Sequence, residues 1–129
     1  MHILVVDDEA DTRALLKDLL EPAGHPVTAA AAASEALVHI QMNKFDLILL
    51  DVMMPGIDGH QLAQFLSNQW DTFDIPIVMI SCRRDRESKG WAKVNGCTRY
   101  LEKPFTTTEL FDAIDEVERQ RAEDPALPR

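Results

Sequence analysis

The sequence has little cysteine, no long apolar run and no recognisable leader segment. Cys82 and Cys97 are its two cysteines, and neither belongs to a CxxC pair, so we do not expect a zinc site. We also expect no structural disulfide, because nothing at the amino terminus resembles a signal peptide. The apolar runs are too short to cross a bilayer. These absences favour a cytoplasmic protein that does not enter a membrane.

Positive charge is also scarce, and it is not clustered. The chain has 13 Lys and Arg residues against 22 Asp and Glu residues, and its formal net charge is −9. Without a run of Lys or Arg, direct binding to nucleic acid or to an anionic membrane lacks an electrostatic basis. Acidic residues, in contrast, gather near the amino terminus, at Asp7, Asp8, Glu9 and Asp11. That cluster suits either a solvated helix start or a cation site.

Short apolar runs recur along the 129 residues, a length that suits one domain with a single core. Five of these runs are predicted strands, at residues 3–6, 27–30, 47–50, 75–80 and 99–101. The run at 47–50 is apolar without alternation, which is typical of a parallel strand covered on both faces. Pro76 lies near the start of its strand, where a missing N–H donor is tolerable.

Amphipathic segments separate the predicted strands. The first helix has one apolar face, formed by Leu15, Leu16, Leu19 and Leu20. Ser34 is a suitable N-cap for the second helix, which turns Leu37 and Ile40 inward. The third helix is predicted to bury a stripe of Leu62, Phe65, Leu66 and Trp70.

The last two helices differ in how clearly they are marked. The fourth, at about residues 85–95, has a thin apolar stripe and contains Gly90. The fifth begins at a capping box of Thr106 and Glu109 and buries Leu110, Ile114 and Val117. It is predicted to end near residue 121, which leaves residues 122–129 as a C-terminal tail or the start of a linker.

Alternating strands and helices with short connections predict a doubly wound α/β fold with a five-stranded parallel sheet and five helices. In such sheets, ligands bind beyond the carboxyl ends of the strands, at the point where the strand order reverses. This rule directs attention to the residues that follow each predicted strand.

Polar side chains follow four of the five strands. Asp7 and Asp8 follow the first, Asp51 the third, Ser81 the fourth and Lys103 the fifth. Taken singly, each has an ordinary interpretation as a helix cap, a turn residue or a solvated surface residue. Their arrival together at one end of the sheet favours a functional site.

The charges of these residues indicate the chemistry of that site. Two carboxylates about 4 Å apart repel each other by roughly 4 kcal/mol at an effective dielectric constant near 20. Compensation must come from protonation, an amine or a cation. Lys103 can offset one charge, and Mg²⁺, which prefers oxygen ligands, can offset the rest. No histidine has ligand spacing with these acids, which disfavours a softer metal.

A carboxylate placed beside Mg²⁺ and a lysine is suited to attack phosphorus and to form an aspartyl phosphate. The other ligands that occupy such folds are flavins and nucleotide phosphates, which need an anion-binding loop after the first strand. Here that position is the acidic run of residues 7–11, which would repel a phosphate unless a metal intervened. Phosphoryl acceptance is therefore the favoured chemistry.

Four motifs extend this interpretation to a family. They are LVVDDE at 4–9, DVMMPGIDG at 51–59, MISC at 79–82 and YLEKPF at 100–105. In this order and spacing, the chain resembles receiver domains of two-component response regulators, in particular single-domain, chemotaxis-regulator-like receivers, over about residues 1–121. The resemblance implies a flavodoxin-like sheet with strand order 2-1-3-4-5.

The resemblance also implies a role for each site residue. Asp51 would be the phospho-acceptor, and Lys103 would pair first with its carboxylate and then with the phosphoryl oxygens. Asp7, Asp8 and Asp51 would hold Mg²⁺ (or Mn²⁺), with Asp8 as a direct ligand and the backbone carbonyl of Met53 as another. The peptide bond between Lys103 and Pro104 would be cis, as an X-Pro bond permits.

Two residues match the switch of the family. The Ser81 hydroxyl would move toward the phosphoryl oxygen, and Tyr100 would rotate inward to fill the space that it leaves. The surface that changes would be formed by the fourth helix, the fifth strand and the fifth helix. Cys82 stands where the family usually has alanine or glycine, and it could be a small buried residue or an oxidisable thiol.

The expected function is a phosphorylation-switched module in a phosphorelay of signal transduction, with only self-phosphorylation and autodephosphorylation chemistry. The phosphoryl donor would be a sensor histidine kinase or a histidine phosphotransfer protein. The receiver would act on a downstream protein effector or on an output domain beyond residue 129. One alternative is a pseudo-receiver that docks constitutively. Another is an aspartyl-phosphate hydrolase, which would need a general acid at position 53, where the chain has Met53.

Overall fold

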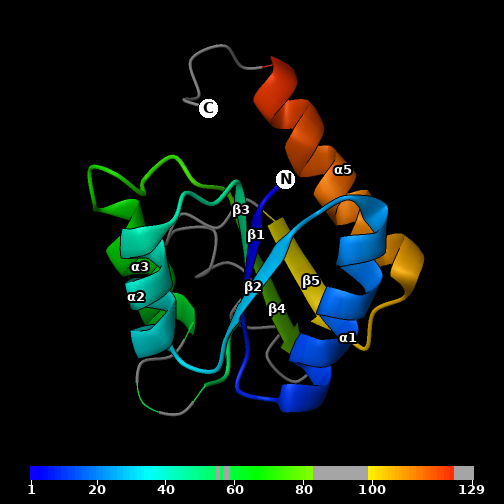
Figure 1. The fold of residues 1–129 in the computed structure, drawn as a ribbon, viewed down its shortest axis with the longest axis horizontal. Coiled ribbons are helices and arrows are strands. Elements are labelled where there is room, and N and C mark those ends of the chain that lie inside the picture. Colours follow the sequence, from blue (N-terminus) through cyan, green and yellow to red (C-terminus); the bar gives the residue numbers. More distant parts are fainter. Residues whose placement is uncertain (55, 57–58, 83–98, 124–129) are drawn as a thin grey trace.

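Five parallel strands form one sheet in the order β2-β1-β3-β4-β5 (Figure 1). The structure is a computed structural model that describes residues 1–54, 56, 59–82 and 99–123. The strands are β1 (Ile3–Val6), β2 (Val27–Ala30), β3 (Leu47–Asp51), β4 (Ile77–Cys82) and β5 (Arg99–Lys103). The doubly wound fold and its strand order are confirmed. β3 runs one residue further than predicted, because Asp51 still pairs with Ile80 of β4.

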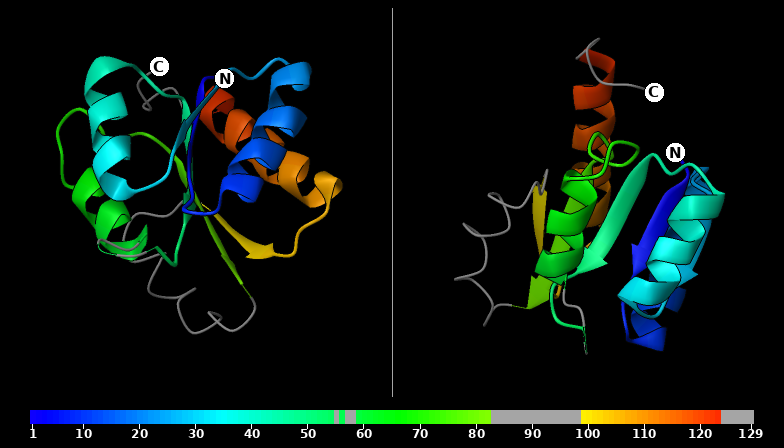
Figure 2. Two further views of the ribbon diagram at one scale, coloured as in Figure 1. Left: turned by 60° about the horizontal axis from the view of Figure 1, so that its bottom comes forward. Right: turned by 90° about the vertical axis from the view of Figure 1, so that its left-hand side faces the viewer.

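Helices cover both faces of the sheet. They are α1 (Ala10–Leu20), the short 3-10 helix η1 (Glu21–Ala23), α2 (Ala33–Met42), α3 (Gly59–Ser67) and α5 (Thr107–Glu123). α1 and α5 lie on one face and α2 and α3 on the other, as the left-hand view of Figure 2 shows. The helix predicted at about 85–95 lies outside the described residues. None of the described helices has the length and apolarity needed to span a bilayer.

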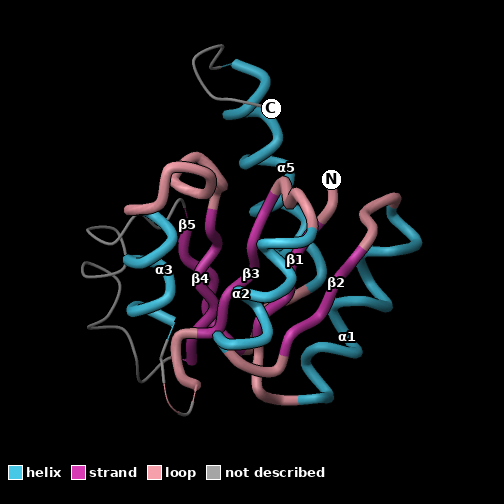
Figure 3. The backbone as a smooth tube through the Cα atoms, turned by 60° about the vertical axis from the view of Figure 1, so that its left-hand side comes forward, coloured by secondary structure: helices cyan, strands magenta, loops and turns pink. Residues whose placement is uncertain are grey.

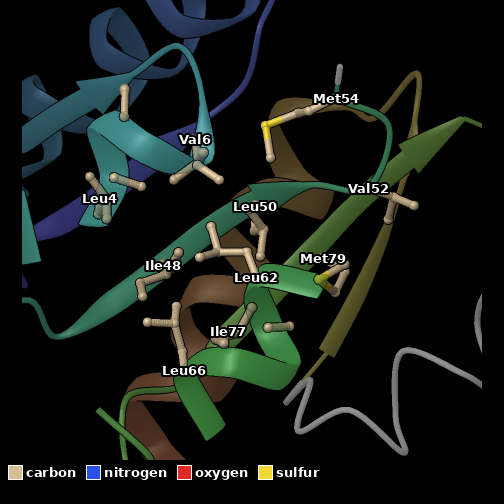
Figure 4. Packing of buried hydrophobic residues seen from close by; sticks show 14 of the residues in the cluster. Leu4, Val6, Ile48, Leu50, Val52, Met54, Leu62, Leu66, Ile77 and Met79 are labelled. Carbon is tan, nitrogen blue, oxygen red and sulfur yellow. The ribbon is translucent and has the colours of Figure 1, made fainter. Parts of the chain in front are cut away.

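The core consists of two apolar layers, one on each face of the sheet. Successive side chains of a strand point to opposite faces. Ile3 and Val5 therefore pack beneath α1 and α5, while Leu4 and Val6 belong to the layer beneath α2 and α3. Figure 4 shows this second layer, in which Leu62 and Leu66 of α3 lie against side chains of β3 and β4. The two-sided burial explains why the central strands are apolar without alternation.

The helix ends confirm one predicted cap and contradict another. The Thr106 N–H donates to Glu109 Oε1 at 3.0 Å, and the Glu109 N–H donates to Thr106 Oγ at 3.1 Å, which is the predicted capping box. α5 continues to Glu123, slightly beyond the predicted end. The Ser34 N-cap is wrong, because α2 begins at Ala33 and its N-cap is Ala32, so Ser34 lies inside the first turn. The side chain of Glu35 accepts a hydrogen bond from a backbone N–H just before this helix.

Three predicted core positions are wrong. Leu15 is 50% exposed, because α1 packs on the sheet through the narrower stripe of Leu16 and Leu20, leaving Leu15 at its margin. Phe65 is 48% exposed, and Trp70 is 90% exposed because it lies beyond the end of α3 at Ser67. At this end of α3 the Thr72 Oγ1 donates to the Leu66 carbonyl at 2.7 Å, so that a carbonyl in the last turn of the helix has a hydrogen-bond partner.

Two adjacent leucines of α1 provide a matched test of this packing. Leu16 is fully buried, so Leu16→Ala should lower the free energy of unfolding by about 2–5 kcal/mol. Leu15→Ala makes the same chemical change on a half-exposed side chain and should cost less than about 1 kcal/mol. Urea denaturation followed by circular dichroism measures both values. Equal costs would contradict the placement of α1 on the sheet.

Candidate functional site

The acceptor predicted from the sequence stands at the carboxyl end of the central strand β3. Asp51 is the last residue of β3, and its side chain is nearly buried. The backbone that follows is held on both sides. The Val52 N–H donates to the Ile80 carbonyl at 2.9 Å, and the Val52 carbonyl accepts from the Gly59 N–H at 2.9 Å. These two hydrogen bonds therefore hold the backbone next to Asp51 in place.

Two further acids reach the same place from the neighbouring strand. Asp7 directly follows β1 and is buried, and its N–H donates to the Ala30 carbonyl of β2 at 3.1 Å. Asp8 is next in the chain and exposed. β1 and β3 are neighbours that end side by side, at the lower end of the sheet in Figure 3. One carboxylate oxygen from each of Asp7, Asp8 and Asp51 lies within 4.8 Å of the others.

Lys103, from the end of β5, supplies a positive charge to this cluster. Its ammonium nitrogen lies 3.0 Å from Asp7 Oδ2, 3.4 Å from Glu9 Oε1 and 3.9 Å from Asp51 Oδ1. Lys103 thus forms the predicted ion pair with Asp51, and it lies closer still to Asp7. Glu9 is a contact that sequence reasoning missed, although Glu9 belongs to the acidic run of residues 7–11. The peptide bond between Lys103 and Pro104 is cis, as predicted.

The pKa of Lys103 is raised in this environment. Burial by itself lowers the pKa of the ammonium group, but its hydrogen bond to Asp7 raises it. The negative charges of Asp51, Asp7 and Glu9 act in the same direction. The net result is an ammonium group that stays protonated, with its positive charge fixed among the carboxylates.

The Asp51 carboxyl group has its pKa raised to about 7, and burial is the largest cause. The charge of Asp7 raises the pKa further, and Asp8 makes a smaller contribution in the same direction. Lys103 and the hydrogen bond from the Met53 N–H, at 3.4 Å, lower it without cancelling the rise. Lys103 is thus not enough to neutralise the site.

The arrangement fits a hard divalent cation. Three carboxylate oxygens from the ends of two adjacent strands converge, and burial together with the charges of Asp7 and Asp8 makes ionised Asp51 unfavourable. Carboxylate oxygens are the ligands that Mg²⁺ and Mn²⁺ prefer. The Met53 side chain is exposed, and the ligand predicted for the cation at this residue is its backbone carbonyl. That carbonyl ligand stays a prediction.

The two predicted switch residues lie on neighbouring strands and contact each other. Ser81 of β4 is buried, and its hydroxyl forms a hydrogen bond with the hydroxyl of Tyr100 on β5. The Tyr100 ring is partly buried and packs against the apolar layer beneath α2 and α3. The Cys82 side chain lies outside what the structure describes, so its predicted alternatives stay open.

Gly59, where α3 begins, touches the main chain of the acceptor. A Cβ atom at this position would lie 2.2 Å from the Asp51 carbonyl oxygen and 2.8 Å from the Val52 Cα. Only glycine allows α3 to start so close to the acceptor strand. Sequence reasoning missed this contact, because nothing in the local pattern reveals which backbone lies opposite Gly59.

Comparison with known proteins agrees with this geometry. The family model of response regulator receiver domains matches residues 3–115, a range that includes all the site residues above. The phosphate regulon transcriptional regulatory protein PhoB of Pseudomonas aeruginosa is 38% identical over 118 residues, which are 92% of this chain and 52% of PhoB. Protein PilH of the same organism is 31% identical over 116 residues, 90% of this chain and 96% of PilH.

Solved structures give the same result. The chemotaxis protein CheY4 of Vibrio cholerae superposes with a TM-score of 0.85 at 33% identity, covering 90% of this chain and 97% of CheY4. The chain thus matches nearly the whole of CheY4 and PilH, while it spans about half the length of PhoB. By its sequence and its fold, this chain belongs to the response regulator receiver domain family.

Proposed function

We propose that Asp51 accepts a phosphoryl group from a phosphohistidine and that this modification switches the binding of a protein partner. The donor would be a sensor histidine kinase or a histidine phosphotransfer protein. The observation that carries the proposal is the setting of Asp51, with two other carboxylates within 4.8 Å and the Lys103 ammonium at 3.9 Å. Phosphoryl acceptance is the general activity of the family.

The transfer is a substitution at phosphorus. An ionised Asp51 oxygen attacks the phosphorus atom, so that a P–O bond forms while the P–N bond to the donor histidine breaks. The electron pair of the P–N bond stays on the imidazole nitrogen, which takes up a proton from solvent. Lys103 keeps its charge in this site and would neutralise negative charge on the oxygens of the transferred group.

Asp7, Asp8 and Asp51 would hold Mg²⁺ or Mn²⁺, with the Met53 carbonyl as a further ligand. When bound, the cation supplies positive charge against the phosphoryl oxygens. The Asp7 carboxylate is already oriented, because Lys103 donates to one of its oxygens at 3.0 Å and the Glu9 N–H to the other at 2.9 Å. A cation held there would lower the raised pKa of Asp51 and so keep the acceptor ionised near neutral pH.

The hydrogen bond between Ser81 and Tyr100 supports a route from the site to the surface. A Ser81 hydroxyl that turns toward a phosphoryl oxygen must give up its bond to Tyr100. The inward rotation of Tyr100 stays a prediction, and its ring packs against the core layer beneath α2 and α3. The first event we infer is therefore an exchange of hydrogen bonds, which changes the surface of β5, α5 and the helix predicted at about 85–95.

We infer a cytoplasmic signalling role rather than that of an enzyme acting on a separate substrate. The recipient of the signal would be a downstream protein effector or an output domain beyond residue 129. PhoB is named as a transcriptional regulator and is about twice as long as the matched region, which supports the second possibility. PilH, of which the chain covers 96%, supports the first.

Phosphoryl transfer from acetyl phosphate in the presence of Mg²⁺ tests the acceptor assignment. The wild-type chain should gain the mass of one phosphoryl group, and Asp51→Asn should gain none while remaining folded. Asp71→Asn, the same change at an exposed carboxylate, should behave as wild type. Intact-protein mass spectrometry and circular dichroism measure these outcomes. Phosphorylation of Asp51→Asn would refute the assignment, and a wild-type chain that binds neither phosphoryl group nor beryllofluoride would favour constitutive docking.

The raised pKa of Asp51 predicts a pH dependence without metal. Because the folded pKa of about 7 exceeds the ordinary 3.8, the stability that this group contributes is complete below pH 3.8 and is lost as the pH rises to about 7. Asp51→Asn should therefore be more stable than wild type above pH 7, by roughly 1–3 kcal/mol, and equal to it near pH 4.

Mg²⁺ should reduce that difference, because a bound cation stabilises the ionised carboxylate. Urea denaturation from pH 4 to pH 8, with and without Mg²⁺, measures the effect. A stability difference between the two proteins that does not change with pH would contradict a raised pKa at Asp51.

A further inference from the structure

We propose that Arg13 is a positioning residue for the cation site, because it holds the peptide group that joins Asp7 to Asp8. By fixing that peptide group it sets where the Asp8 carboxylate stands. The inference rests on the proposed function, since it takes Asp7, Asp8 and Asp51 as the ligands of Mg²⁺. Sequence reasoning assigned no role to Arg13.

Arg13 lies in the first turns of α1 and makes two contacts in opposite directions. Its backbone N–H donates to the Glu9 carbonyl at 3.1 Å, as a helical residue does. Its guanidinium Nη1 instead reaches back past the start of the helix and donates to the Asp7 carbonyl oxygen at 2.8 Å. A short hydrogen bond from a charged donor is stronger than one between neutral groups.

This contact completes the fixation of Asp7. Its N–H is bound to the Ala30 carbonyl of β2, and its carboxylate is bound by Lys103 and by the Glu9 N–H. Its carbonyl lies just beyond the end of β1, and no backbone N–H among the described residues donates to it. Arg13 takes the place of a strand partner for this buried residue.

Asp8 is the residue that depends most on this arrangement. Its side chain is exposed, and within the described ranges no group donates a hydrogen bond to its carboxylate. Even so, one of its oxygens stands within 4.8 Å of oxygens of Asp7 and Asp51, against their mutual repulsion. Because no described group bonds to the Asp8 carboxylate, the Asp8 backbone sets the region that this carboxylate can reach, and the preceding peptide group is the one that Arg13 holds.

Groups that orient metal ligands without touching the metal typically change metal affinity by about 10–100-fold. Arg13→Gln removes the charged donor and should weaken Mg²⁺ binding by about 10-fold. Arg13→Lys keeps the charge but has a single-point ammonium in place of the guanidinium fork, so the loss should be smaller, about 3-fold. The matched control is Lys17→Gln, which removes the same charge from an exposed residue one helical turn further on.

Isothermal titration with Mg²⁺ of the wild type and the three variants measures these affinities, and circular dichroism verifies that each is folded. Phosphorylation by acetyl phosphate is then followed as a function of Mg²⁺ concentration. Arg13→Gln should need about 10-fold more Mg²⁺ for half-maximal phosphorylation and should approach the wild-type rate once Mg²⁺ saturates. Lys17→Gln should match the wild type in both measurements.

Several results would overturn the inference. One is wild-type Mg²⁺ affinity in a folded Arg13→Gln. Another is an equal loss of affinity in Lys17→Gln, which would show that the effect does not depend on the contact between Arg13 and Asp7. If Arg13→Gln does not fold, Arg13→Lys decides the question, and wild-type affinity in that variant would refute positioning by the guanidinium. A wild-type chain that binds no Mg²⁺ would instead refute the proposed function itself.

Discussion

The candidate site of this domain depends on one interaction, the electrostatic repulsion among the carboxylates of Asp7, Asp8 and Asp51 at the carboxyl end of the sheet. Asp7, Asp8 and Asp51 stand within 4.8 Å of one another, and Lys103 offsets only part of their charge. The main chains on either side are tied to the sheet by hydrogen bonds at Asp7 and Val52, so the acids cannot move apart freely. The pKa of Asp51 is raised to about 7, chiefly by its burial, and the charges of Asp7 and Asp8 add to that rise. A site under such strain gains from any cation or phosphoryl chemistry that relieves it.

The strand order makes this convergence possible. β2 pairs with one side of β1 and β3 with the other, so the direction of winding reverses between β1 and β3. Both strands are buried on both faces, one layer beneath α1 and α5 and the other beneath α2 and α3. The ends of two strands packed in this way move little, because a close-packed interior has low compressibility. The stability of the core thus offsets the cost of assembling charges that repel.

Two hydrogen bonds extend the site beyond its charged centre. The bond between Ser81 and Tyr100 connects β4 to β5, and the Tyr100 ring in turn packs on the core layer beneath α2 and α3. The bond from Arg13 to the Asp7 carbonyl connects the site to α1. The cluster of carboxylates is therefore linked to α1, and the neighbouring Ser81 is linked to the edge strand β5. The family model matches residues 3–115, a range that contains all these residues. The chain covers nearly all of PilH and about half of PhoB.

The sequence by itself determined the existence of the five strands, their parallel pairing and the end of the sheet at which Asp51 and Lys103 meet. These features follow from hydrophobic periodicity and from the connection rules of α/β folds, which act locally and repeat along the chain. The sequence pattern misplaced β4, predicted at 75–80 and found at Ile77–Cys82, and it ended β5 at 101 rather than at Lys103. Only the tertiary structure decided that Trp70 is exposed, that Gly59 lies against the acceptor backbone and that Arg13 reaches Asp7. Where a helix stops, and which backbone lies opposite a side chain, depend on how whole elements pack, and no local pattern records that packing.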